Sequence, residues 1–168
     1  MIRIENAVSA AVALLLVVPL SATAGSAGEQ PKQLAGQTLK QPASEQKLHQ
    51  LVLQVNVNDP AMMNLTLNNA TNVAQYYEEL GEKATIEVVT FGPGLHMLRD
   101  DTSPVKARIK MIRENNPAIS FKACGNTQEN MRKAENKEIP LIPQAKVVSS
   151  GVVRVMELQE RGWSYVKP

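Results

Sequence analysis

Cysteine is almost absent from this chain of 168 residues, which contains only Cys124. A lone thiol cannot form an internal disulfide, so the fold has to be stabilised by its apolar core. Cys124 follows an apolar segment, residues 118–123, and precedes Gly-Asn-Thr, residues 125–127, which is typical of a turn into a helix. The amides of a helix N-terminus lower the pKa of a neighbouring thiol. Cys124 is therefore either a reactive group or a small buried side chain, and both interpretations stay open.

Aromatic residues and net charge are also scarce. Aromatic residues make up 4% of the chain, and the formal net charge at pH 7 is +2. Proteins that bind nucleic acids combine a basic surface with aromatic side chains on which bases stack. Neither feature is visible, so we expect no nucleic-acid partner.

Histidine and nucleotide-binding motifs are equally sparse. The two histidines, His49 and His96, are expected at opposite ends of the sheet, whereas zinc needs three or four converging ligands. The glycine-rich turn at residues 92–94 lacks the spacing of a dinucleotide or phosphate-binding loop. We therefore expect neither a metal nor another cofactor.

Long apolar runs are missing except near the N-terminus. Residues 7–20 are apolar, follow Arg3, and precede the small residues 22–24. This order is typical of a secretory signal peptide and predicts cleavage after Ala24, with an uncleaved anchor as the alternative. The run is shorter than the roughly 20 residues that span a bilayer. We expect a periplasmic protein with no membrane span after cleavage.

The chain divides into three predicted parts. Residues 1–24 form the predicted signal peptide, and residues 25–45 form a flexible leader because they contain Gly, Pro and Gln without apolar periodicity. Residues 46–168 are the predicted globular domain.

Within the domain, short apolar runs alternate with amphipathic stretches. The expected strands are residues 48–57, 85–91, 119–123, 146–149 and 163–166. The expected helices begin at Asp59–Pro60, Ser103–Pro104, Asn126 and Gly151. This alternation predicts an α/β fold of the flavodoxin-like, doubly wound kind, with about five mainly parallel strands and helices on both faces of the sheet.

In such sheets, binding sites lie at the carboxyl ends of the strands. Cys124 falls on this rim, as does His96, so a thiol nucleophile with a histidine base is one hypothesis. Amides at the start of the third helix would stabilise a thiolate, whereas the carboxylate of Glu129 would raise its pKa. The residues expected to form the pocket around the thiol are Gly92, Gly94, Asn126 and Thr127.

Three segments carry a family resemblance: residues 87–98, 121–127 and 149–168. The last is the most specific, with Gly-Val-Val, Glu-Leu-Gln, Gly-Trp and a terminal Lys-Pro. Together they resemble the DsrE/DsrF-like sulfur-relay family over residues 46–168. The resemblance implies a small α/β domain that assembles into homo-oligomers, commonly trimers or hexamers. Sulfur-carrying members bear a persulfide on a cysteine just after a strand, which is the place of Cys124.

The function expected from these features is an exported carrier or binder of sulfane sulfur, held as a persulfide on Cys124. Its partners would be a sulfur donor or acceptor protein, or a small sulfur compound. The alternative is a periplasmic, non-catalytic binding or assembly module in which the cysteine is structural. A third hypothesis is a cysteine hydrolase that uses His96 as its base.

Overall fold

The computed structural model describes residues 47–168 of the chain. The predicted signal peptide, residues 1–24, and the predicted leader, residues 25–45, lie outside the described residues. Within the described range, no helix combines the length and the apolar character that a bilayer crossing requires.

A five-stranded parallel sheet forms the centre of the domain. Its strands are β1 (Leu48–Val55), β2 (Lys83–Thr90), β3 (Ile119–Cys124), β4 (Ala145–Val148) and β5 (Ser164–Val166). They lie in the order β4-β3-β2-β1-β5, and every neighbouring pair is parallel. The chain thus adds strands outward from β1 to β4 and then crosses back to the free side of β1. The predicted doubly wound α/β class is confirmed.

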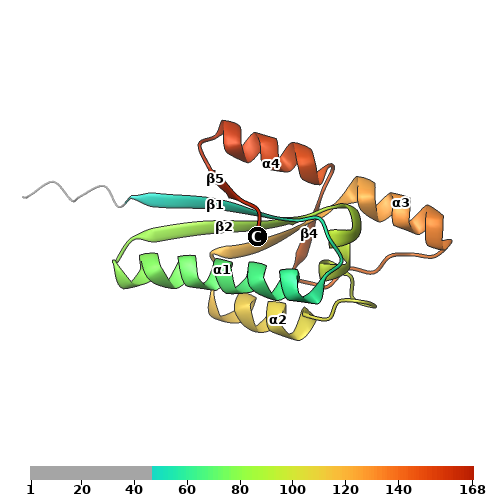
Figure 1. The fold of residues 1–168 in the computed structure, drawn as a ribbon, viewed down its shortest axis with the longest axis horizontal. Coiled ribbons are helices and arrows are strands. Elements are labelled where there is room, and N and C mark those ends of the chain that lie inside the picture. The colour runs from blue at the N-terminus through green and yellow to red at the C-terminus, as the bar shows by residue number, and fades with distance from the viewer. Residues whose placement is uncertain (1–46) are drawn as a thin grey trace, which may run out of the picture. The chain divides into compact units, whose positions relative to one another are not determined.

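Helices cover both faces of this sheet. They are α1 (Pro60–Glu79), the 3-10 helix η1 (Gly92–Leu98), α2 (Lys106–Asn115), α3 (Gly125–Glu135) and α4 (Gly151–Glu160). Figure 1 shows α1 and α2 on one face, α4 on the other, and α3 displaced toward the carboxyl ends of the strands. The direction reversal between β4 and β5 puts α4 on the face opposite α1.

The core has two parts because side chains alternate between the faces of each strand. Leu53 of β1 and Phe121 of β3 belong to the larger cluster, which includes buried residues of α1 and α2. Val52 of β1 and Val89 of β2 belong to the smaller cluster beneath α4. Continuous apolar strands are expected where a parallel sheet is covered on both faces.

The predicted start of α1 is confirmed by its cap. The Asp59 carboxylate accepts a hydrogen bond from the Ala61 amide at 2.8 Å, and Pro60 is the first helical residue. The second helix starts later than predicted, at Lys106. Ser103 bonds the Met97 carbonyl and the Val105 amide instead, which holds the chain in a turn before the helix.

Gly94 marks a close approach between η1 and the end of β1. A Cβ atom placed on Gly94 would lie 2.2 Å from the carbonyl oxygen of Val55. The other atoms nearest to it belong to the backbone of Val55 and Asn56. Gly94, predicted as a pocket residue, is therefore required for packing η1 against the sheet.

We expect Gly94→Ala to lower the free energy of unfolding by about 3 kcal/mol, because neither backbone can move away without strain. Urea denaturation would measure the change. Gly162→Ala is the matched control: Gly162 has a φ of +86° with nothing within 4 Å of its added Cβ, so only a backbone cost of about 1 kcal/mol applies. An equal or smaller loss in Gly94→Ala would contradict the packing role.

Candidate functional site

Cys124 lies where two helices begin. It is the last residue of β3 and the N-cap of α3, and its side chain is 4% exposed. The start of α4 also touches it, since a Cβ on Gly151 would lie 3.2 Å from the Cys124 Cβ. The positive ends of two helix dipoles therefore face one sulfur atom, which favours a negative charge there.

Polar groups around Cys124 outweigh the effect of its burial on the pKa of the thiol. Burial acts to raise the pKa of the thiol, but donors from the Thr127 hydroxyl and from the amides of Gly151, Thr127 and Asn126 act against it. The net result is a pKa below the ordinary value of a cysteine. A thiolate is the nucleophilic form of cysteine, so this environment favours reactivity at sulfur.

Gly92 orients the Thr127 hydroxyl, which lowers the pKa of the Cys124 thiol. The Gly92 amide donates to Thr127 Oγ1 at 2.9 Å, which occupies an acceptor site and leaves the hydroxyl proton for the Cys124 sulfur. Gly92 has a φ of +51°, in the left-handed region that glycine adopts readily. The bond links η1, after β2, to α3, after β3.

The structure thus brings together Cys124, Gly92, Thr127 and the backbone of Asn126. Sequence reasoning missed Gly151 as part of the site, although it predicted that a helix begins at this residue. A Cβ on Gly151 would also lie 2.8 Å from a ring carbon of Phe91, so only glycine lets α4 approach the thiol this closely.

His96 lies on η1 and bonds a different partner. Its Nδ1 atom is 2.8 Å from Thr102 Oγ1, and no hydrogen bond connects it with Cys124 in the described part of the chain. The groups that stabilise the thiol are therefore amides and a hydroxyl, without a histidine partner.

The expected effect of Glu129 on the thiol is wrong. Glu129 lies beyond the first turn of α3, which contains no acidic residue. It pairs with Arg132 at 2.7 Å and with Lys133 at 3.3 Å, and these cations lower its pKa to about 2. Its charge is thus neutralised within the helix. The error has a local cause, because α3 is capped by Cys124 and not by Asn126.

The second histidine lies away from the candidate site. His49 Nε2 is 2.5 Å from a Glu82 carboxylate oxygen, and its ring stacks on Tyr77 with centroids 3.5 Å apart. Across residues 47–168, no three histidine, cysteine or acidic side chains gather as a metal ion would require.

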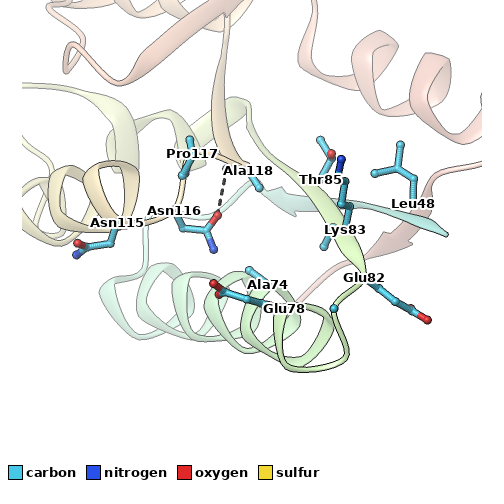
Figure 2. A pocket seen from close by; sticks show the side chains of 12 residues that line it. Leu48, Ala74, Glu78, Glu82, Lys83, Thr85, Asn115, Asn116, Pro117 and Ala118 are labelled. Atoms are coloured by element: carbon cyan, nitrogen blue, oxygen red, sulfur yellow. Dashed lines mark hydrogen bonds between the residues drawn. The ribbon is translucent and has the colours of Figure 1, made fainter. Parts of the chain in front are cut away.

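Two hollows of the surface, of about 520 and 600 Å³, are not lined by Cys124. Figure 2 shows one of about 520 Å³ at the amino ends of the strands, bordered by Leu48, Lys83 and Ala118. The side chain of Asn116 closes its edge by accepting a 3.1 Å hydrogen bond from the Ala118 amide. None of the candidate site residues lines this hollow, so the candidate site is defined by its donors and not by a cavity.

Comparisons with known proteins support the fold. No protein-family model and no curated protein matches the chain. A solved structure titled "Structure of Protein of Unknown Function MTH1491 from Methanobacterium thermoautotrophicum" is similar, with 27% sequence identity and a TM-score of 0.61. The match covers 71% of this chain and 99% of that one. Its title assigns no activity.

We expect Cys124 to titrate below the free thiol value of about 8.5. Thr127→Val should raise its pKa, because the isosteric side chain cannot donate to sulfur, whereas Thr127→Ser should keep it low. The rate of alkylation by iodoacetamide as a function of pH would measure each pKa. Equal pKa values in the two variants, or a wild-type value at that of a free thiol, would contradict the assigned donors.

Proposed function

We propose that this protein is an exported carrier or binder of sulfane sulfur, which it holds as a persulfide on Cys124. The observation that carries the proposal is a buried cysteine where β3, α3 and α4 meet, with a pKa that the nearby Thr127 hydroxyl and the amides of Gly151, Thr127 and Asn126 lower. Such donors stabilise a charged sulfur without a metal or a second thiol. The predicted signal peptide supports export to the periplasm.

The chemistry follows from the thiolate. The Cys124 thiolate attacks the terminal sulfur of a persulfide or polysulfide donor, the S–S bond of the donor breaks, and the donor leaves as a thiolate or a shorter polysulfide. The product, Cys124–S–S⁻, carries the same single negative charge as the reactant. Transfer to an acceptor thiolate reverses these steps, so the protein acts as a carrier and not as a turnover enzyme.

The arrangement of the three family-like segments also supports the proposal. Residues 87–98 contribute Gly92, residues 121–127 contribute Cys124 and Thr127, and residues 149–168 begin beside Gly151. Segments that are separate in sequence, and that resemble the DsrE/DsrF-like family, thus meet around Cys124. Membership of that family, with a persulfide on the cysteine after a strand, is part of the proposal.

A structural cysteine is the second candidate, and burial favours it. Cys124 is 4% exposed and lies against Gly151, so its thiol also fills space between β3 and α4. In a binding or assembly module, the cysteine would need only this packing role. The two candidates differ in whether the native thiol reacts.

We further propose that the protein forms a homo-oligomer, with a trimer or hexamer as the expected size. Exposed apolar side chains lie on α4 and on the two opposite edge strands, β4 and β5; they are Val147, Val152, Val153, Met156, Tyr165 and Val166. Exposed apolar surface marks protein interfaces where it is contiguous, and Val152, Val153 and Met156 share the helix α4. A second copy of the chain would cover them.

Incubation with a polysulfide should add sulfur to the wild-type protein in whole-atom steps, beginning with one sulfur, because the thiolate is the acceptor. Intact-protein mass spectrometry would detect the gain, and Cys124→Ser should show none. No gain in the wild type, or an equal gain in Cys124→Ser, would contradict sulfur carriage. A thiol that alkylates only after unfolding would support the structural cysteine.

Met156→Glu should dissociate the oligomer, because it places a charge in the apolar patch. Met111→Glu on α2 is the matched control, since Met111 and Met156 are 58% and 54% exposed. Light scattering coupled to size-exclusion chromatography would give the masses. A wild-type monomer, or dissociation by Met111→Glu alone, would contradict an interface on α4.

A further inference from the structure

Burial of Cys124 creates a problem of access. A sulfur carrier has to present its sulfur to a donor and then to an acceptor, yet the Cys124 side chain is 4% exposed. The helix α3 begins at the next residue, and the start of α4 touches Cys124, since a Cβ on Gly151 would lie 3.2 Å from the Cys124 Cβ. One of these helices has to move if the sulfur is to be reached.

The packing of the two helices differs. Val155 and Leu158 of α4 are buried in the smaller core cluster. In contrast, α3 fully buries none of its 11 described residues, and its Met131 packs, partly buried, against the larger core cluster. Figure 1 shows α3 displaced from the layers formed by α1, α2 and α4. Segments with few buried apolar contacts open at low cost in free energy, so α3 is the helix that can move.

Ion pairs hold the far end of α3. Arg99 follows η1 and is 1% exposed. Its Nε and Nη2 atoms donate to Asp101 at 2.9 and 2.8 Å, and its Nη2 donates to Glu135, in the last turn of α3, at 2.9 Å. A second nitrogen of Arg99 also donates to Glu135. Lys137 bridges the two carboxylates at 3.1 and 3.3 Å.

The chain on either side of α3 is fixed. Cys124 before it is part of β3, and Ile139 and Ile142 after it are buried. The Ile142 amide donates to the Leu98 carbonyl at 3.0 Å. The movable part therefore runs from residue 125 to residue 138, with Asn136 in a left-handed conformation, φ +48°, at the end of the helix.

Within this part, α3 has its own stabilising pairs. Glu129 forms ion pairs with Arg132 and Lys133 one turn along the same helix. Pairs three and four residues apart stabilise a helix without tertiary contacts. These internal pairs favour the helical state of α3 when the helix moves.

We propose that α3 is a gate over Cys124, held closed by a latch in which Glu135 and Asp101 share the buried Arg99 guanidinium. The inference rests on the proposed function, because it concerns access to the same sulfur. In the closed state the amides of Asn126 and Thr127 stabilise the charged sulfur. Opening removes those donors and exposes the sulfur, so storage and exchange belong to different positions of one helix.

Glu135→Gln tests the latch, because it removes a charge and keeps the size of the side chain while Asp101 still pairs Arg99. At a pH where the thiol is fully ionised, we expect alkylation of Cys124 to accelerate about two- to fivefold, as for the loss of a partly exposed ion pair. Hydrogen exchange should accelerate in α3 alone. The midpoint of urea unfolding should stay close to the wild-type value.

Glu129→Gln is the matched control, since it removes the same charge from α3 but only from pairs within the helix. Its alkylation rate should equal that of the wild type. A Glu135→Gln rate equal to that of the wild type, equal acceleration in both variants, or faster exchange throughout the domain would overturn the gate. These measurements use no sulfur donor, so their failure is distinct from a failure of sulfur loading.

Discussion

The convergence of two helix N-termini on one sulfur atom is the constraint on which the rest of the site depends. Adjacent β3 and β4 bring the starts of α3 and α4 together, and Gly151 lets α4 come within contact of Cys124. The Gly92 amide donates to the Thr127 hydroxyl oxygen, which leaves the hydroxyl proton of Thr127 for the sulfur. Because helix N-termini and hydrogen-bond donors favour negative charge, this arrangement favours a thiolate over a neutral thiol.

The same convergence places burial and charge in opposition. Removal of the thiol from water disfavours the thiolate, and only directed donors reverse that preference. A structural cysteine has no need of this compensation, because a neutral thiol packs as a small apolar group. The donors around Cys124 are therefore better explained by a charged sulfur than by space filling, and this difference favours sulfur carriage over a structural cysteine.

The sequence predicted what depends on local chemistry and failed where distant segments meet. Asp59 and Pro60 start α1 as expected, since a cap and its proline are adjacent. The strand order was beyond prediction, because right-handed crossovers permit the flavodoxin order 2-1-3-4-5 as well as the order found here. Cys124 was located on the rim, whereas its contact with Gly151 required the pairing of β3 with β4. The pairing of Arg99 with Glu135 joins residues 36 positions apart, and no periodic pattern in the sequence indicates it.

The distribution of charges along α3 gives the two ends of the helix different roles. Its first turn has no acidic residue, so nothing there competes with the thiolate for the amides. Its last turn places Glu135 against a cation that is itself buried and so costly to leave unpaired. Asp101 reduces that cost, because Arg99 keeps one carboxylate when Glu135 departs. A buried apolar side chain at position 135 would hold α3 in the closed position. The Arg99 guanidinium, which Glu135 shares with Asp101, holds the closed position and keeps one carboxylate partner when α3 moves.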